Sequence, residues 1–201
     1  MKLAPIQRAP KWQLYGLSFK AMGSPCDIKV WSDSSEQADR ALLSARSEID
    51  RLEQKYTRYK ESSLTSQINR MAGRGQPISI DTETYQLLCY ADEAYRLSDG
   101  LFDITSGVLR RGWDFRRGMV PGRQQLDSLR QLIGWTKVEF NEQHIILPET
   151  GMEIDFGGYV KEYAADAAAN VCFQSGIISA IVNLGGDIRV VGPQPDGSGW
   201  P

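Results

Sequence analysis

The stretch Glu153–Val191 constrains this chain more than any other, because two glycine pairs beside acidic residues bracket one predicted helix. The first pair, Gly157–Gly158, follows Asp155 and precedes an alanine-rich segment that predicts a helix over 159–174. A short apolar strand is expected just before Asp155. Glycines at such a turn can adopt positive φ and let a ligand approach the backbone. The pattern therefore predicts strand, glycine turn and helix in that order.

The first turn also has the chemistry of an anion site. The first amides of a helix are unpaired donors that attract anions, so a phosphate fits this position. Lys161 would add a mobile positive charge there, while Asp155 suits a sugar hydroxyl, an amide donor or a metal. A nucleotide contains both kinds of partner.

The second turn repeats the arrangement of a glycine pair beside a carboxylate. The apolar run 177–182 predicts a strand, which ends at Asn183 and is followed by Gly185–Gly186 and Asp187. Each turn taken alone is also consistent with a simple corner of the fold, since these residue types are common in turns. The repetition favours a functional interpretation.

Composition bounds the class of protein. The chain has 201 residues, 41% of them hydrophobic, and a formal net charge of −2 at pH 7. That length can bury a sizeable core in one domain or slightly more. Lys and Arg are interspersed with acids rather than clustered, so no nucleic-acid partner is expected.

The cysteines and the N-terminal region bear on the compartment. Cys26, Cys89 and Cys172 are far apart and odd in number, so we expect buried thiols rather than disulfides or a cysteine zinc site. No signal-peptide or lipid-anchor pattern is visible, and no segment is long enough to span a membrane. A cytoplasmic location is expected, or a periplasmic or membrane-associated one if an export signal was removed.

The remaining pattern predicts an α+β fold. Apolar residues at steps of three and four predict one long amphipathic helix, with the apolar face formed by Ala38, Leu42, Ala45, Ile49, Leu52 and Tyr56. Further helices are predicted over 82–98 and 124–133, and a hairpin is predicted around Asn141–Gln143. Strands and helices do not alternate one for one, which favours a mixed or antiparallel sheet with flanking helices.

Several single residues allow two interpretations. Tyr59 follows the end of a helix, where an aromatic ring can stack on a flat ligand or simply fill a gap in the packing. The basic segment 113–121, with Arg110 and Arg111 before it, is expected to be solvated surface. His144 is expected to be a surface strand residue and not a catalytic base.

A set of motifs in chain order resembles the ApbE family, the FAD:protein FMN transferases. The resemblance runs from about Phe19 to the last residue. The motifs are Met22-Gly23-Ser24, Arg58-Tyr59 with Ser63-Leu64 and Asn69, Asp99 to Thr105, Gly134-Trp135, Asp155 to Lys161 and Asn183 to Asp187. Each motif is weak alone, and their order and spacing make the assignment.

The resemblance implies an ApbE-like, T-fold-related architecture and a phosphoryl-transfer activity. Family members bind FAD and, with a divalent metal that is usually Mg²⁺, transfer FMN to a Ser or Thr hydroxyl of a target flavoprotein, releasing AMP. Two alternatives stay open: a FAD pyrophosphatase that yields FMN and AMP, and a non-catalytic FAD-binding module or split half that needs a second chain. The oligomeric state is open, a dimer included.

The resemblance also implies roles for particular residues. Lys161 would meet the pyrophosphate and Asp155 would hold a polar group of FAD, and these two are the catalytic candidates. Tyr59 would stack on the flavin. The other expected cofactor contacts are Met22, Leu101, Phe102, Asp103, Asn183, Gly185, Gly186 and Asp187. The backbone carbonyl of Gly158 would be a metal ligand.

Three departures from the family pattern matter. Ser24 stands where threonine is usual, and Glu162 stands where glycine is common after the lysine. The third is that the family's later His-containing and metal-binding motifs are not found in this sequence. We therefore expect residues 19–201 to form an ApbE-like domain that lacks its C-terminal portion and is inactive alone, preceded by an extension over 1–18.

Overall fold

The computed structural model describes residues 11–113, 118 and 120–201, and these fall into two compact units. The first unit combines the described residues up to Glu53 with Tyr159–Pro201, and the second is Gln54–Gly158. The predicted N-terminal extension lies partly outside the described residues, and its positions 13–18 belong to the first strand. Most of the basic segment 113–121 also lies outside them.

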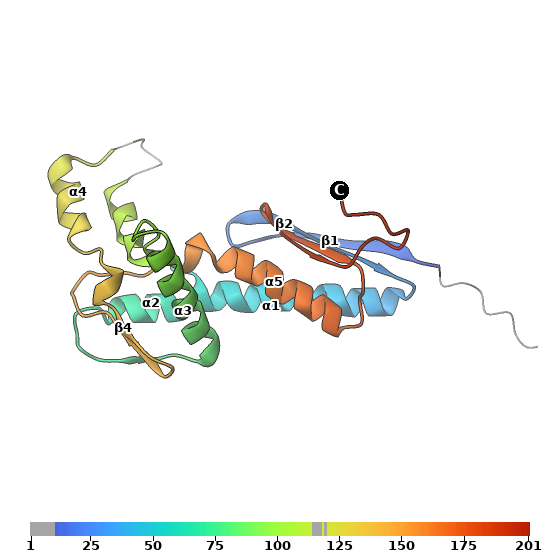
Figure 1. The fold of residues 1–201 in the computed structure, drawn as a ribbon, viewed down its shortest axis with the longest axis horizontal. Coiled ribbons are helices and arrows are strands. Elements are labelled where there is room, and N and C mark those ends of the chain that lie inside the picture. The colour runs from blue at the N-terminus through green and yellow to red at the C-terminus, as the bar shows by residue number, and fades with distance from the viewer. Residues whose placement is uncertain (1–10, 114–117, 119) are drawn as a thin grey trace, which may run out of the picture. The chain divides into compact units, whose positions relative to one another are not determined.

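The first unit is built on a four-stranded antiparallel sheet, drawn in blue and red in Figure 1. Its strands are β1 (Gln13–Ala21), β2 (Ser24–Ser32), β6 (Ala180–Leu184) and β7 (Asp187–Val191), in the order β1-β2-β6-β7. Two-residue turns, Met22–Gly23 and Gly185–Gly186, join the outer pairs. Both residues of each turn have positive φ, which suits the twist of an antiparallel hairpin.

Helices α1 (Ser35–Tyr56) and α5 (Val160–Gln174) run along one face of this sheet (Figure 1). The face is apolar because alternate residues of β2 and β6 point to it, among them Ile28, Val30 and Val182, all fully buried. Alanines on α5 allow the helix to pack closely on β6 and β7. The last turn of α1 belongs to the second unit.

The predicted apolar face of α1 is confirmed. The side chains that face the core are Ala38, Leu42, Ala45, Ile49, Leu52 and Tyr56, each 6% exposed or less. A regular step of three and four residues places them on one side of the helix, where burial of that side stabilises it. The helix begins where Ser34 Oγ accepts a hydrogen bond from the Gln37 amide at 3.2 Å.

The second unit consists of short helices around a small sheet. Its helices are α2 (Leu64–Arg70), α3 (Thr82–Leu97) and α4 (Arg123–Arg130), with 3-10 turns η1 (Ile104–Gly112), η2 (Trp135–Lys137) and η3 (Phe156–Gly158). Strands β3 (Ile78–Ser79), β4 (Glu139–Phe140) and β5 (His144–Ile146) pair antiparallel in the order β3-β5-β4. The expected hairpin around residues 141–143 is present. The α+β class is confirmed, and both sheets are antiparallel.

Three local expectations were wrong. No strand is assigned before Asp155: Met152 and Ile154 are buried, but the segment is extended coil. The strand predicted at 177–182 is shifted to Ala180–Leu184, because Gly176 and Ile177 still hydrogen-bond to the end of α5. Cys89 is exposed, since it follows the buried Leu88 on α3 and points away from the core, whereas Cys26 and Cys172 are buried. Among the described residues, no helix is long and apolar enough to cross a membrane.

Candidate functional site

In the second unit, Asp155 is held in place by a side chain from α2. Asn69 donates from Nδ2 to the Ile154 carbonyl at 3.0 Å and accepts from the Ile154 amide at 2.8 Å. These two bonds replace those that a neighbouring strand would supply. The Asp155 amide in turn donates to the Ile104 carbonyl at 2.9 Å. The extended segment is thus fixed by one side chain and one loop.

The Asp155 carboxylate pairs with Arg58, which follows the end of α1. Arg58 Nη1 donates to Asp155 Oδ2 at 2.5 Å, and the Gly157 amide donates to Oδ1 at 2.9 Å. The two side chains are only 25% and 19% exposed. Charge-assisted bonds in partly buried surroundings are stronger than exposed ones. Sequence reasoning gave Arg58 no role, although it stands beside Tyr59 in a quoted motif.

The glycines of the first turn do not have the conformation that was expected of them. Neither Gly157 nor Gly158 has positive φ, so neither is required by backbone strain. Space is limited at Gly157, where a Cβ would lie 3.0 Å from Asp155 Oδ1, whereas a Cβ on Gly158 would lie at an ordinary contact distance of 3.5 Å from the Phe102 ring. Phe156 anchors the turn, since it is fully buried and its ring centroid lies 4.9 Å from that of Tyr56.

Tyr56 is therefore a structural residue of this turn. Burial raises the pKa of Tyr56 to about 12, and its hydroxyl lies 3.1 Å from Thr84 Oγ1. The phenol stays protonated at neutral pH and can act as a hydrogen-bond donor inside the unit.

The loop that carries Leu101, Phe102 and Asp103 is tied by its own polar groups. Leu101 is 91% exposed, and the Phe102 amide donates to Ser98 Oγ at 2.8 Å. Asp103 Oδ1 accepts from the Thr105 amide at 2.7 Å, while Oδ2 accepts from the Trp135 amide at 3.1 Å. Both oxygens of Asp103 thus bond to the protein and join this loop to η2.

The two arginines that were expected on a solvated surface instead bind Glu153. Arg110 and Arg111, on η1, each form an ion pair with this carboxylate, which is 8% exposed. A buried carboxylate needs such partners. These contacts fix η1 against the segment that leads to Asp155, and sequence patterns gave no sign of them.

In the first unit, Lys161 on α5 and Asp187 on β7 are brought together. Lys161 Nζ lies 3.2 Å from Asp187 Oδ2, with the two side chains 29% and 25% exposed. The lysine is not oriented to donate a hydrogen bond to that buried oxygen, which has no hydrogen-bond partner among the described residues. Asp187 therefore has acceptor capacity that the protein does not fill.

The second turn places its residues beside this ion pair. Asn183 Oδ1 accepts from the Gly186 amide at 2.8 Å and closes the turn. Gly185 has φ +70°, and a Cβ on it would lie 2.5 Å from Ser24 Cβ. The turn between β1 and β2 is therefore a neighbour of the turn between β6 and β7.

Met22 lies in that first hairpin turn with φ 49°, which is unusual for a residue other than glycine. Its amide donates to Glu53 Oε1 at 2.8 Å. This bond holds the turn in place, and Glu53 was not predicted to take part.

The predicted site residues thus form two groups, one in each unit. The first unit joins Lys161 and Asp187 with Asn183, Gly185, Gly186 and the Met22 turn. The second joins Asp155, Gly157 and Gly158 with Phe102, and adds Arg58 and Tyr59.

The described residues do not fit a magnesium site. None of them form a group of three or more His, Cys, Asp or Glu that could hold a metal ion. The two carboxylates expected nearby already pair with Arg58 and Lys161. Mg²⁺ takes six oxygen ligands in near-octahedral geometry, so the predicted Gly158 carbonyl alone would leave it under-coordinated.

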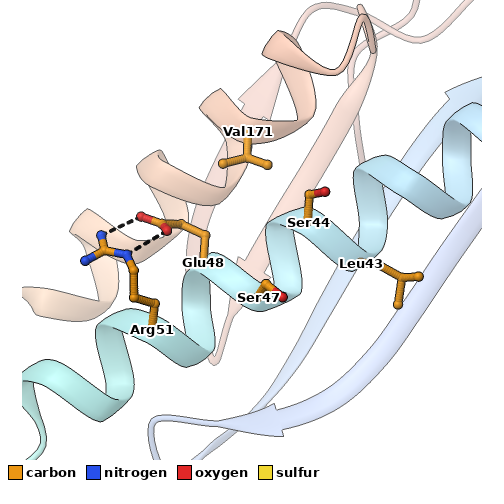
Figure 2. Close-up of a pocket in the computed structure, with 6 residues that line it drawn as sticks. All are labelled: Leu43, Ser44, Ser47, Glu48, Arg51 and Val171. Carbon is orange, nitrogen blue, oxygen red and sulfur yellow. Dashed lines mark hydrogen bonds and ion pairs between the residues drawn. The ribbon is translucent and has the colours of Figure 1, made fainter.

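A hollow on the surface of the first unit contains none of the predicted residues. It is lined by Leu43, Ser44, Ser47, Glu48, Arg51 and Val171, from α1 and α5 (Figure 2). Arg51 and Glu48 form two hydrogen bonds with each other, at 2.7 and 2.8 Å. Its two charged groups thus bond to each other.

Comparison with known proteins gives a consistent result. Residues 22–201 match the ApbE family. An FAD:protein FMN transferase of Klebsiella pneumoniae is 29% identical over 184 residues, covering 90% of this chain and 57% of the relative. One of Chlamydia pneumoniae is 30% identical, covering 89% of this chain and 55% of the relative. The chain thus spans about half the length of these curated relatives.

Solved structures show the same fold. The flavin transferase ApbE of Vibrio cholerae superposes with a TM-score of 0.85 at 22% identity, covering 94% of this chain and 63% of that one. The ApbE protein of Thermotoga maritima gives a TM-score of 0.80 at 28% identity, covering 90% and 60%.

Proposed function

Because the chain belongs to the ApbE family, we propose that it takes part in the transfer of FMN from FAD to a Ser or Thr hydroxyl of a target flavoprotein. The observation that carries this proposal is the Lys161–Asp187 pair at the start of α5, which joins two family motifs. The lysine is partly exposed and can reach an anionic ligand. The relatives' printed activity supplies the reaction class.

The reaction balances without a redox step. The acceptor hydroxyl oxygen bonds to the FMN-side phosphorus of FAD, and the bond from that phosphorus to the bridging oxygen breaks. AMP leaves with the bonding electron pair, and the hydroxyl proton is released. Negative charge grows on the leaving oxygen, where a positioned cation stabilises the transition state. Lys161 is the residue proposed for this role.

The family resemblance proposes FAD contacts for each unit separately. In the first, these are Met22, Asn183, Gly185, Gly186 and Asp187 together with Lys161. In the second, these are Tyr59, Leu101, Phe102, Asp103 and Asp155. Tyr59 is 81% exposed, so its ring is available for stacking on a flavin. The family resemblance adds Mg²⁺, but no step is assigned to it because the described residues do not gather its ligands.

The test is FMN transfer measured with two readouts. The chain, completed by the C-terminal portion of the family domain that residues 19–201 are expected to lack, is incubated with FAD, Mg²⁺ and acceptor polypeptides that carry Ser or Thr. In-gel flavin fluorescence and AMP release are then followed. Lys161→Ala should lower the transfer rate about 100-fold or more, as loss of one charge-stabilising group typically does. The matched control is Lys29→Ala, at an exposed position on β2.

The outcomes separate the alternatives. Flavin-labelled acceptor and AMP in equal amounts support transfer. AMP release without an acceptor would indicate hydrolysis of FAD instead. Binding of FAD without AMP release, with every acceptor tried, would overturn the proposal in favour of a binding module.

A further inference from the structure

Arg58 makes several contacts in the second unit and has no role in the proposed chemistry. Its guanidinium bonds through Nη1 to Asp155 Oδ2 at 2.5 Å and through Nη2 to the Tyr59 hydroxyl at 2.7 Å. Its Cζ also lies 4.5 Å from the centre of the Tyr59 ring. One planar group thus contacts both a candidate catalytic carboxylate and a candidate stacking ring.

We propose that Arg58 is a positioning residue that holds the Tyr59 ring as a preformed platform for the flavin and fixes it relative to Asp155. This inference rests on the proposed function, since it concerns how the same site receives FAD. It adds a residue that contributes to binding through two neighbours, the Tyr59 ring and the Asp155 carboxylate.

Exposure supports this role. Tyr59 is 81% exposed, yet the guanidinium covers one face of its ring, so the opposite face is open to solvent. An exposed tyrosine normally samples several rotamers, and binding must immobilise it. A ring already held by a hydrogen bond and a cation–π contact avoids most of that entropy loss.

The base of the platform is also fixed. Ser66 Oγ, on α2, donates to the Arg58 carbonyl at 3.3 Å, and the Arg58 side chain is 25% exposed. Arg58 Nε is buried without a hydrogen-bond partner among the described residues. The fork of Arg58 is therefore directed to Asp155 and Tyr59, and it gives up one hydrogen bond in that position.

The charge of Arg58 has a second consequence for an anionic ligand. Paired with Arg58, the Asp155 carboxylate contributes little net negative charge to its surroundings. Without Arg58, the same carboxylate would repel the FAD phosphates. Riboflavin has no phosphate, so its affinity depends only on how the Tyr59 ring is held. The affinity for FAD depends both on that ring and on repulsion between Asp155 and the phosphates.

The experiment is a double-mutant cycle on flavin binding, followed by quenching of flavin fluorescence. Arg58→Ala should weaken FAD binding about fivefold to tenfold, the range expected when one side chain must be ordered on binding. In the Tyr59→Ala background the same change should weaken riboflavin binding no further, because the platform is already absent. Tyr59→Phe keeps the ring but loses the bond to Nη2, and it should show a smaller loss.

The control variant is Arg51→Ala, which removes an arginine from an exposed ion pair with Glu48 (Figure 2). Its flavin affinity should equal that of the wild type. Urea unfolding of each variant separates loss of fold from loss of binding. Arg58→Lys keeps the charge without the fork, and it should recover FAD binding only in part.

Each outcome decides a different point. Equal loss of riboflavin affinity in the Tyr59 and Tyr59→Ala backgrounds, or no loss in either, overturns the role of Arg58 while the proposed function stands. Flavin binding that follows the expected cycle without any FMN transfer supports the role of Arg58 and overturns the proposed function. If the wild-type protein binds neither FAD nor riboflavin, both are overturned.

Discussion

At Gly185–Gly186 both glycines have positive φ, +70° and +108°, whereas neither Gly157 nor Gly158 does, although each pair lies beside an aspartate. In the hairpin turn, glycine is needed because other residues are strained in that conformation. In the turn before α5 neither glycine has positive φ, and a Cβ would lie 3.0 Å from Asp155 Oδ1 at Gly157 but at an ordinary 3.5 Å from the Phe102 ring at Gly158. The same two-residue pattern is thus required by the backbone conformation in one turn and not in the other.

The aspartates beside these glycines differ as well. Asp155 is bonded through both oxygens, to Arg58 and to the Gly157 amide. Asp187 has only an ion pair with Lys161, at 3.2 Å, and its buried Oδ2 has no hydrogen bond among the described residues. One carboxylate is hydrogen-bonded through both oxygens, and the other has a buried oxygen whose contact is an ion pair alone.

The largest expected loss of stability comes from replacing a glycine, and it tests whether the two glycine pairs differ. Gly185→Ala should lower the free energy of unfolding by about 2–4 kcal/mol, since its positive φ is strained and its Cβ would meet Ser24 Cβ at 2.5 Å. Gly158→Ala should change it by less than about 0.5 kcal/mol, because its nearest neighbour would be 3.5 Å away. Urea unfolding followed by circular dichroism measures both.

Equal costs at the two positions would show that the pairs serve the same purpose. If Gly158→Ala folds normally but loses FAD affinity, the space at that glycine is used by the ligand. The matched reference is Gly199→Ala, at a position with no positive φ, nothing within 4 Å of its Cβ position and no helix to cap.

The next largest expected loss of stability tests whether the two aspartates are held differently. Asp155→Ala should cost about 2 kcal/mol of stability, because it leaves the Arg58 guanidinium partly buried without its carboxylate. Asp187→Ala should cost about 1 kcal/mol or less, since the flexible Lys161 can turn to solvent. Comparison of the two urea midpoints tests this, and a larger cost at Asp187 would contradict it.

A third group of acids around a cation, in the second unit, gives a reference value for the loss of stability on removing an aspartate. Lys55 Nζ lies 2.5 Å from Asp81 and 2.7 Å from Glu83, and Asp81 caps α3 through the Thr84 amide at 3.0 Å. Burial alone would raise the pKa of Asp81, but hydrogen bonds from Lys55 and Thr84 outweigh it and lower that pKa well below 3.8. Asp81→Ala should cost about 1 kcal/mol at pH 7, mainly through the lost cap.

The pH dependence of that cost has a definite sign. A lowered pKa in the folded state stabilises the protein above the unfolded value of 3.8, and the benefit disappears as the pH falls below it. The difference between wild type and Asp81→Ala should therefore shrink in urea titrations below pH 3.8. A difference that stays constant to lower pH would show that Lys55 and Thr84 do not hold the carboxylate in solution.

The sequence predicted the elements whose residue types and spacing within one short segment determine their structure. The face of α1 follows from apolar residues at steps of three and four, and the turn at Gly185–Gly186 follows from turn chemistry. The segment before Asp155, where a strand was predicted and none is present, shows where prediction from local sequence fails. That segment is held by Asn69, 85 positions away, and no periodicity in the sequence reports such a contact.

The candidate site also contains residues that the motifs identified and residues that they missed. The motifs placed Lys161 and Asp187 in the same proposed site, and the structure puts them 3.2 Å apart. The motifs gave no role to Arg58, Glu53 or Glu153, because their partners are distant in sequence. Arg58 and Asp155, for example, are separated by 97 positions.

The sequence by itself determined the family, the α+β class and the two acidic glycine turns, because these depend on residue type, order and local spacing. Only the tertiary structure decided which conformation each glycine pair adopts and which cation each aspartate pairs with. Backbone angles and ion pairs depend on contacts between distant segments. Two similar motifs can therefore hold their carboxylates differently, Asp155 bonded through both oxygens and Asp187 with one oxygen unfilled.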